Sequence, residues 1–319
     1  MARRELGPAT LAVARAVAAA LTAADTHLLI ACSGGPDSLA LAFGAWRAAD
    51  REGRALTGVV VDHGLQPDSA MVAGRAADQL RRLGFGDVVV TPVAMPTDAA
   101  GGPEAAARTV RYAALRTEAA SRDASIWLGH TLDDQAENVL LGLARGSGLR
   151  SLAGMSPRTG QLVRPLLGLR RTVTEQACAE LGLEPWSDPH NADARFARVR
   201  VRRTVLPTLE AELGPGAAEA LARTAALARD DADLLDALAA EADPGTDVLD
   251  AAALLDQPTA LRTRVIRRWL LRHGADEVTA AHVAAVDALV THWHGQREIH
   301  LPGVSVTRQD GSLHCRPDY

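Results

Sequence analysis

The sequence contains no lysine, so all 34 of its basic residues are arginine. This absence excludes enzymes that work through a lysine amine, such as those that form a Schiff base with pyridoxal phosphate or a lysyl-nucleotide intermediate. It also excludes the Walker A loop of P-loop NTPases, because that loop needs a lysine at the phosphates. The absence thus narrows the classes of enzyme that this chain can represent.

Cysteine is also scarce, and long apolar runs are missing. Cys32, Cys178 and Cys315 lie far apart and form no CxxC pair, which argues against a structural zinc site, an iron–sulfur cluster and a disulfide framework. No run of about 18 or more uninterrupted apolar residues occurs, so we expect no membrane span. The apolar N-terminal stretch is similar to a signal peptide, but Arg15 interrupts it and favours a short amphipathic helix. These features suit a reduced, cytoplasmic setting.

The net charge of −5 is unevenly distributed along the chain. Residues 1–203 hold 24 arginines against 21 acids, a net charge of +3. Residues 204–319 hold 10 arginines against 18 acids, a net charge of −8. A nucleic-acid site in this acidic protein would therefore have to be a local basic patch.

Strand-like and helix-like segments alternate in the first half of the sequence. Buried apolar strands that alternate with helices indicate an α/β fold with a parallel, doubly wound sheet covered on both faces. Ligands of such folds bind beyond the carboxyl ends of the strands. Short apolar runs predict strands at 28–32, 56–62, 87–93 and 125–130, and helical patterns predict helices at 38–51, 68–83, 104–122 and 133–145.

Beyond residue 145 the pattern loosens, and we expect three parts in the chain. Residues 1–210 would form the catalytic domain, 211–244 a helical linker, and 245–319 a smaller, mainly helical domain. The linker ends close to an acidic stretch with proline and glycine, residues 241–247. The last residues of the small domain, from Ile299, read as short strands around turns.

The run Ser33-Gly34-Gly35-Pro36-Asp37-Ser38 follows the first predicted strand and opens a helix. Its glycines let the backbone approach a ligand closely, and the N–H groups at the start of the helix face an anion such as phosphate. Asp37 would repel a phosphate, so we expect it to bind a Mg²⁺ ion that bridges the phosphates. The alternative is an ordinary strand–helix turn with a serine cap.

Polar residues also follow the second and fourth predicted strands. Asp62 and His63 end the second strand, where turn and cap chemistry is an equally simple explanation. The fourth strand leads into the run Gly129-His130-Thr131-Leu132-Asp133-Asp134-Gln135-Ala136-Glu137. Asp134 and Glu137 are spaced i, i+3, so their carboxylates lie together and are able to bind a metal ion or a cationic amino acid. Helix capping is the alternative, but it explains one of the three acids better than all of them.

Several sets of arginines are candidates for phosphate contacts. Arg108 and Arg111 share one face of a predicted helix, where a solvated surface is the alternative. A stripe at residues 264, 268 and 272 is as readily explained by pairing with the acids of residues 230–250. Five more arginines follow Asp188-Pro189-His190-Asn191 closely, with no acid among them: Arg195, Arg198, Arg200, Arg202 and Arg203.

The run at residues 33–38 resembles the PP-loop of the N-type ATP pyrophosphatases, which split ATP between its α and β phosphates and adenylate an oxygen of the acceptor. Further stretches resemble the tRNA(Ile)-lysidine synthetases of that superfamily: VDHGLQPDSA from residue 61, ARTVRYAAL from residue 107, HTLDDQAENVLLGLARGSG from residue 130, and the segment 188–207. Two positions depart from the family pattern, because Gln66 replaces a common arginine and His190 a serine or threonine.

The resemblance implies a PP-loop fold with a small tRNA-contacting C-terminal domain, ATP and Mg²⁺ as cofactors, and a homodimer. The implied substrates are free L-lysine and tRNA(Ile) with a CAU anticodon, whose wobble cytidine is adenylated at O2 and then attacked at C2 by the lysine amine. The implied ATP-binding residues are those at 33–38 with Asp62, His63, Arg108, Gly129 and His130, and the implied metal ligands are Asp37 and Asp133. The implied lysine-binding residues are Asp134, Glu137, Asp188 and Asn191; the catalytic ones are Asp37, Asp133, Asp134 and Glu137; and the tRNA-binding ones are Arg111, Arg145, Arg195, Arg198, Arg200 and Arg203.

Two other hypotheses are open on the sequence alone. One is another PP-loop enzyme that modifies tRNA, such as a thiolase, although thiolases of this class usually carry CxxC pairs or a catalytic cysteine. The other is a non-catalytic protein that binds nucleotide or tRNA through a degenerate PP-loop. The intact run at residues 33–38 and the acids at 133 and 134 argue against such decay.

Overall fold

The computed structural model describes residues 6–64, 68–94, 102–146, 148–188 and 193–318 of the chain. It divides into two compact units, residues 1–145 with 154–225 and residues 146–153 with 226–319. The division falls within the long helix α10 (Ala217–Ala242), which occupies most of the segment expected to be a linker. The two units are described in turn.

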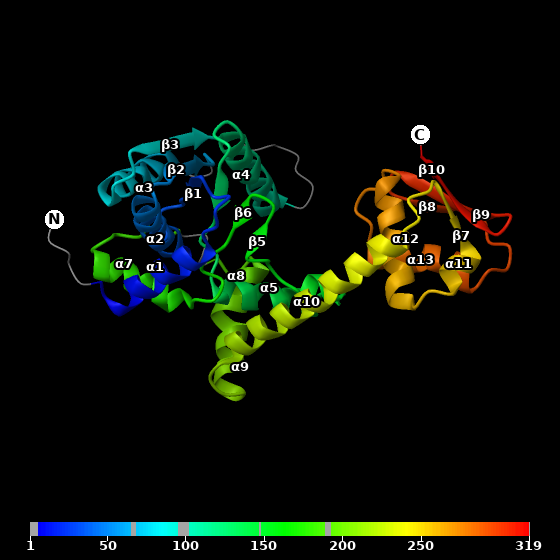
Figure 1. The fold of residues 1–319 in the computed structure, drawn as a ribbon. Coiled ribbons are helices and arrows are strands. Elements are labelled where there is room, and N and C mark those ends of the chain that lie inside the picture. The colour runs from blue at the N-terminus through cyan, green and yellow to red at the C-terminus, as the bar shows by residue number, and fades with distance from the viewer. Residues whose placement is uncertain (1–5, 65–67, 95–101, 147, 189–192, 319) are drawn as a thin grey trace. The chain divides into compact units, whose positions relative to one another are not determined.

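The first unit is built on a six-stranded sheet with the order β3-β2-β1-β4-β6-β5 (Figure 1). All neighbouring strands are parallel except β5, which is antiparallel to β6. The first four strands confirm the predicted ones, whereas the β5–β6 hairpin was not anticipated. The strands are β1 (His27–Ala31), β2 (Ala55–Asp62), β3 (Asp87–Pro92), β4 (Ser125–Trp127), β5 (Arg158–Thr159) and β6 (Leu162–Val163).

Strand β1 lies at the point where the chain order of the sheet reverses, between β2 and β4. In open α/β sheets, the carboxyl ends of the strands beside such a reversal border a crevice. The loops that follow β1, β2 and β4 carry the three predicted motifs. The topology therefore brings together residues that are about 100 positions apart in the sequence.

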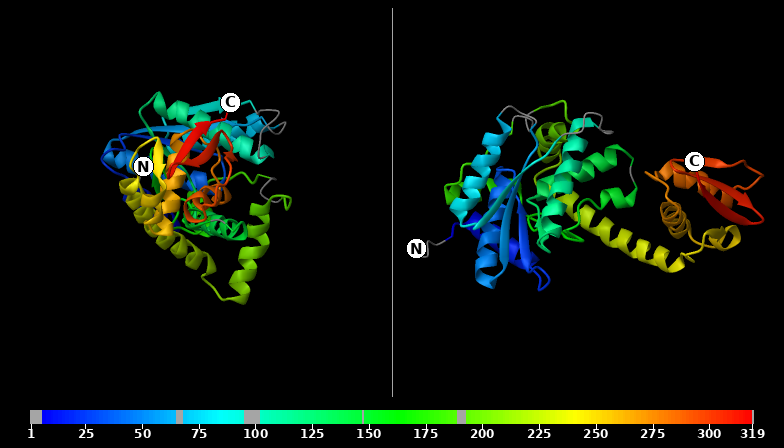
Figure 2. Two further views of the ribbon diagram at one scale, coloured as in Figure 1. Left: turned by 90° about the vertical axis from the view of Figure 1, so that its right-hand side faces the viewer. Right: turned by 90° about the horizontal axis from the view of Figure 1, so that it is seen from above.

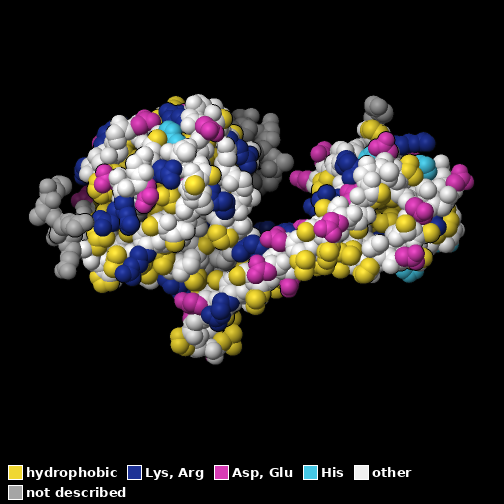
Figure 3. Space-filling view, in the orientation of Figure 1, with side chains coloured by type: hydrophobic (Ala, Val, Ile, Leu, Met, Phe, Trp, Pro, Cys, Tyr) yellow, Lys and Arg dark blue, Asp and Glu magenta, His cyan; other side chains and the backbone are white. Residues whose placement is uncertain are grey.

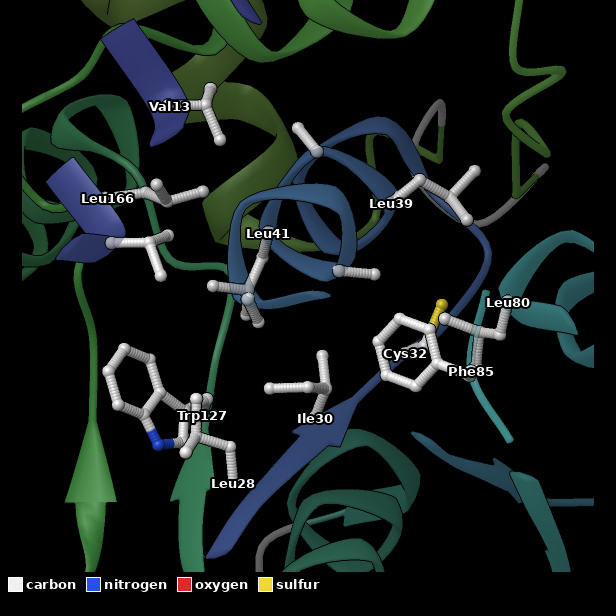
Figure 4. Packing of buried hydrophobic residues seen from close by; sticks show 14 of the residues in the cluster. Val13, Leu28, Ile30, Cys32, Leu39, Leu41, Leu80, Phe85, Trp127 and Leu166 are labelled. Atoms are coloured by element: carbon white, nitrogen blue, oxygen red, sulfur yellow. The ribbon is translucent and has the colours of Figure 1, made fainter. Parts of the chain in front are cut away.

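Helices cover both faces of this sheet (Figures 1 and 2). Leu28 and Ile30 of β1 face one side, and Leu29 faces the other, as the two-residue period of a strand requires. Figure 4 shows Ile30 and Leu41 in the cluster between β1 and α2, with Trp127 beside them. The first face is covered by α1 (Pro8–Ala20), α2 (Pro36–Glu52), α3 (Ser69–Leu83) and α7 (Arg171–Leu181), and the second by α4 (Gly102–Ala120).

The other helices of the first unit come after β4 or after β6 in the chain. Helix α5 (Leu132–Ala144) carries the acidic motif and packs through Leu132 and Ala136 against Leu206 and Ala218. Before Leu206, a short helix α8 (Ala197–Arg200) continues into the π-helical turn η2 (Val201–Val205) and then α9 (Leu206–Glu212). This continuous segment places the predicted basic cluster next to α5.

The second unit combines helices with a small antiparallel sheet of order β7-β10-β9-β8. Its core includes Trp269, Val286 and Val306, all fully buried. The predicted strands near the C-terminus are confirmed, and β7 adds a fourth strand that the sequence did not suggest. The elements are α6 (Leu149–Leu152), β7 (Val248–Asp250), α11 (Ala251–Leu255), α12 (Thr259–Arg272), α13 (Ala280–Thr291), β8 (Ile299–Leu301), β9 (Val304–Gln309) and β10 (Ser312–Pro317).

The arginine stripe on α12 is paired within the second unit. Arg264 binds Asp236 at 2.9 Å, and Arg272 binds Asp243 at 2.8 Å. Arg268 approaches the same Asp243 at 3.5 Å. The structure thus bears out the simpler explanation, in which this stripe pairs with the acids of residues 230–250. In the part of the chain that is described, no helix has the length and apolarity needed to span a membrane.

Candidate active site

A cavity of about 900 Å³ opens at the carboxyl ends of β1, β2 and β4. Many of the predicted site residues lie in its wall, from all three strand ends. Further lining residues come from α7 and the segments after it: the sequence reasoning did not single out Arg171, Glu175 or Trp186 for the site, whereas Arg202 belongs to the predicted basic cluster. The predicted site residues in the wall are Ser33, Gly35, Pro36, Asp37, Ser38, Asp62, His63, Arg111, Gly129, His130, Asp134 and Asp188.

The loop at residues 33–38 has the shape of an anion cradle. The Ser38 hydroxyl donates to the Gly35 carbonyl at 2.9 Å and accepts from the Ser33 N–H at 3.2 Å, which closes the loop on itself. Gly34 has φ +80°, a conformation that favours glycine. Helix α2 begins immediately afterwards, at Pro36. Its first N–H groups have no partner within the helix, so this end of α2 suits a negatively charged group.

Gly129 is required by the close approach of the segment after β4 to this loop. A Cβ atom at position 129 would lie 2.8 Å from the Asp37 carbonyl oxygen and 3.1 Å from the Ser38 nitrogen. Both contacts are with backbone, which cannot move aside as a flexible side chain can. The loop at residues 33–38 and the motif after β4 are therefore locked together through their main chains.

Asp37 lies in the cavity wall but is already engaged by α7. Its carboxylate accepts hydrogen bonds from Nε of Arg171, at 3.1 Å, and from the Thr174 hydroxyl. Burial nevertheless raises the pKa of Asp37 above its usual value, because these two partners only partly offset the loss of hydration. A divalent cation bound to phosphate oxygens would offset the negative charge of this buried carboxylate. Asp37 therefore fits the role of a Mg²⁺ ligand.

Asp133 does not meet Asp37 in the cavity. Its carboxylate accepts from the Arg171 backbone N–H at 2.7 Å and pairs with Arg170 at 3.2 Å, so it caps the start of α7. It is absent from the residues that line the cavity. Among the described residues, no three His, Cys, Asp or Glu side chains converge as a metal site would require. The predicted pairing of Asp37 with Asp133 as metal ligands is therefore not seen.

Asp134 has two roles, one for each carboxylate oxygen. Its Oδ2 accepts from the Thr131 N–H at 2.8 Å and completes a capping box at the start of α5, so the capping alternative is also real. Its Oδ1 faces Arg171 at 2.9 Å, Arg202 at 3.3 Å and Arg198 at 3.5 Å. Burial alone would raise the pKa of Asp134, but Arg171, Arg198 and the Thr131 N–H bring it down to about 2.

Glu137 lies next to Asp134, as the i, i+3 spacing predicts, but it is fully buried beneath arginines. Arg202 binds it through two parallel contacts, from Nε at 2.6 Å and from Nη2 at 2.9 Å. Arg198 adds a third, from Nε at 2.8 Å. We call this set the arginine–carboxylate cluster: Arg171, Arg198 and Arg202 with Asp37, Asp134 and Glu137.

The cluster corrects the expected tRNA-binding surface. Arg198 was predicted to contact tRNA, yet its guanidinium is turned toward Glu137. Arg195, Arg200 and Arg203, by contrast, are exposed. Arg195 pairs with Asp193 at 2.7 Å. The i, i+4 pair 198 and 202 therefore faces inward, and the other arginines face outward.

Of the predicted site residues near β2 and α4, some line the cavity and others do not. Arg111 lines the cavity, whereas Arg108 is exposed and contacts the ring of Tyr112 at 4.9 Å. Asp62 accepts from the Gly64 N–H at 3.0 Å, which is the turn chemistry considered as the alternative. Arg145 is exposed at the end of α5. Asn191 lies outside the described residues.

His130 is a buried neutral histidine. Burial lowers its pKa to about 3, and nearby Asp134 opposes this only partly. Its Nδ1 atom is buried and has no hydrogen-bond partner among the described residues, and neither has Nδ1 of His63. Both imidazoles line the cavity. Unpaired buried polar atoms of this kind are costly unless a ligand or water binds them.

Two family models match the chain, one for each part. A family model described as PP-loop domain matches residues 10–209, and one described as TilS substrate binding domain matches residues 249–314. The tRNA(Ile)-lysidine synthase of Leifsonia xyli subsp. xyli is 54% identical over 91% of this chain and 90% of its own length. The chain belongs to the tRNA(Ile)-lysidine synthase family.

Other members of the tRNA(Ile)-lysidine synthase family are similarly close. The synthase of Thermobifida fusca is 53% identical, with 91% of each chain covered, and that of Mycolicibacterium paratuberculosis is 54% identical, with 89% and 88% covered. Among solved structures, the U34-tRNA thiolase NcsA from Methanococcus maripaludis with its [4Fe-4S] cluster matches with a TM-score of 0.59. It is 16% identical and covers 70% of this chain and 79% of its own, so it shows that the fold is shared.

The pKa of His130 leads to a prediction about stability and pH. A histidine in the unfolded chain takes up a proton near the usual pKa of 6.5, whereas folded His130 does so only near 3. As the pH falls from about 6.5 toward 3, the unfolded state binds a proton that the folded state does not, and the free energy of unfolding decreases. We expect the His130→Gln variant to lose less stability than the wild type between about pH 7 and pH 4, by roughly 1–3 kcal/mol. Urea unfolding at each pH measures this, and equal losses in the two proteins would contradict the assignment.

Proposed function

We propose that this member of the family joins lysine to C2 of the wobble cytidine in tRNA(Ile) with a CAU anticodon. Cytidine O2 attacks the α-phosphate of ATP and releases diphosphate; the side-chain amine of lysine then attacks C2, loses a proton and expels AMP. One observation carries the proposal: a single cavity is lined by both the anion cradle and Asp134, and Glu137 is buried next to Asp134 beneath shared arginines. Family membership supplies the choice of acceptor.

The proposed nucleotide site lies at the ends of β1, β2 and β4. The phosphates of ATP meet backbone N–H groups of the loop at residues 33–38, where only Pro36 has none, and the hydroxyls of Ser33 and Ser38. Asp37 holds Mg²⁺, which supplies electrostatic stabilisation of the phosphates when it is bound. The adenosine lies toward Asp62 and His63, where the unpaired Nδ1 of His63 is available to it.

The proposed lysine site is the part of the cavity wall at Asp134, in the first turn of α5. Asp134 is ionised and borders the cavity, so it attracts an ammonium group. Glu137 stands behind it and acts through the arginines that cover it. Asp188 borders the cavity as well. We keep it, together with Asn191, as a proposed contact to lysine.

The proposed tRNA surface is narrower than the sequence suggested. It consists of the exposed arginines at 145, 195, 200 and 203, with Arg111 at the cavity. The proposed location of the enzyme is the cytoplasm, where tRNA is processed. A thiolase activity is less well supported. The three cysteines are far apart in the sequence, and in the described residues they form no cluster site with other ligands.

A homodimer is part of the proposal. Leu227 and Leu234 on α10 are 68% and 60% exposed, and Figure 3 shows a run of apolar side chains along that helix. Exposed apolar surface of this kind favours association. We expect sedimentation velocity to show a dimer of this chain at micromolar concentration; a monomer throughout would remove the dimer from the proposal without affecting the reaction.

The reaction is tested with radiolabelled lysine, ATP and a tRNA(Ile) transcript with the CAU anticodon. The wild type should transfer label to tRNA and release one AMP for each lysine transferred. Asp37→Ala should lower the turnover by at least about a hundredfold, because metal and oxyanion-type contacts have effects of that size. A methionine tRNA with the same anticodon is the matched control. Label in neither tRNA, or turnover that survives Asp37→Ala, would contradict the corresponding part of the proposal.

The tRNA surface is tested by the salt dependence of binding. Each phosphate contact contributes about one unit to the slope of log affinity against log salt concentration. The double variant Arg200→Ala and Arg203→Ala should therefore flatten the slope by roughly two units, if both exposed side chains meet phosphates. ATP binding should not change. An unchanged slope in the double variant would place the tRNA elsewhere on the protein.

A further inference from the structure

Trp186 is the one Phe, Tyr or Trp residue among the described residues that line the cavity. It is half-buried, yet it does not belong to the hydrophobic clusters on either face of the sheet. Within the described part of the chain, its indole N–H makes no hydrogen bond and its ring stacks on no other ring. Trp127 and Trp269, by contrast, are fully buried in hydrophobic cores. Folding therefore leaves the ring of Trp186 available at the cavity.

The main chain of Trp186 places this ring beside the loop at residues 33–38. The Trp186 N–H donates to the Gly34 carbonyl at 2.9 Å. A Cβ atom at Gly34 would lie 4.0 Å from Cβ of Trp186. The side chain of Trp186 therefore begins directly next to the loop where the proposed function puts the phosphates of ATP.

Gln79 fixes the segment that carries Trp186. This residue of α3 is only 7% exposed, and its amide pairs with the main chain of Glu184. Its Nε2 donates to the Glu184 carbonyl at 3.0 Å, and its Oε1 accepts from the Glu184 N–H at 3.0 Å. Movement of the segment would leave buried polar atoms of Gln79 unpaired, which is costly. Trp186, two residues further on, is thus held in place before any substrate binds.

A partly exposed indole suits the flat face of a nucleobase. Bases that have left an RNA stack are commonly bound by stacking on aromatic side chains. Enzymes that perform chemistry on a base need it in this state, because neighbouring bases otherwise cover the reacting atoms. The ring of Trp186 therefore fits a base that has left the anticodon stack.

Two bases take part in the proposed reaction, and their places in the cavity differ. O2 of the acceptor cytosine has to touch the α-phosphate of ATP, whereas a ribose separates adenine from that phosphate. Trp186 lies against Gly34 of the proposed phosphate site. The proposed adenosine site is at Asp62 and His63, at the end of β2. Position therefore favours the cytosine as the base that stacks on Trp186.

We propose that Trp186 is a specificity-determining residue that stacks on the wobble cytosine, and that Gln79 is the positioning residue that holds it there. This inference rests on the proposed function, since it assumes that a cytidine of tRNA enters the cavity. The chain runs on from Trp186 to the exposed arginines at 195, 200 and 203, which are proposed to contact the tRNA backbone. Base and backbone contacts thus come from neighbouring positions in the sequence.

The test is a double-mutant cycle between the ring and the base. Filter binding measures the affinity for tRNA(Ile) with a CAU anticodon, with a non-cleavable ATP analogue present. The same tRNA with an abasic nucleotide at the wobble position is the matched control, and the wild type should bind it less tightly. Trp186→Leu should weaken binding of the intact tRNA by about ten- to a hundredfold, the effect of one base–aromatic contact, and leave binding of the abasic tRNA unchanged. Trp186→Phe, which keeps an aromatic plane, should stay close to the wild type.

Two further measurements separate stacking from a general disturbance of the fold. Substitution of the Trp186 side chain leaves its main-chain N–H in place, so the affinity for the ATP analogue should remain that of the wild type. Gln79→Met removes both contacts to Glu184 at a similar side-chain length, and it should weaken binding of the intact tRNA only. Combined with Trp186→Leu, it should cause no further loss, since Gln79 acts through the ring.

Three results would overturn the inference. Trp186→Leu could weaken binding of both tRNAs equally, which would place the ring against another part of the tRNA, or of neither. It could instead weaken binding of the ATP analogue but not of inorganic triphosphate, which would place the ring against adenine. Failure of the proposed function has a different appearance, because the wild type itself would then bind the intact and the abasic tRNA equally and transfer no lysine.

Discussion

The site depends on one guanidinium. Arg171, at the start of α7, contacts the PP-loop through Asp37 and the acidic helix through Asp134, and it approaches Glu137 at 3.8 Å. Burial opposes its charge, but the surrounding acids raise its pKa further above its already high value, so it stays protonated at any ordinary pH. Without this cation, Asp37 would lose its arginine partner while it stays near the carboxylate of Asp134, in a space with little water. Helix α7 therefore completes a site that the strand ends only begin.

The fold was largely predictable because its signals are local. Apolar runs such as residues 28–32 and 56–62 are long enough to mark buried strands, and the turns between them carry glycine. The β5–β6 hairpin has only two residues in each strand, which is too short for any periodicity to register. Strand β7, with three residues, escaped prediction for the same reason.

The site was predictable in its acids but not in its arginines. The spacing of Asp134 and Glu137 places both on one side of a helix, and the structure keeps them together. Spacing also groups Arg198 with Arg202, but no local rule says whether that side of the segment faces water or α5. Their partners are more than 60 positions away in the sequence. A contact of that range is decided by tertiary packing. The density of arginines therefore suggested a nucleic-acid surface, whereas two of these arginines belong to an internal ion-pair network.

The cationic side chains among the described residues of the cavity wall are all arginines: Arg111, Arg171 and Arg202. A guanidinium group is protonated at physiological pH and is a poor nucleophile, whereas a lysine amine in a buried site readily loses its proton and attacks. In the proposed reaction, the adenylated cytidine lies beside this wall until an amine attacks it. Because no side chain of the protein carries a primary amine, the enzyme cannot trap its own intermediate as a protein–RNA adduct. The amine that does react has to arrive as substrate.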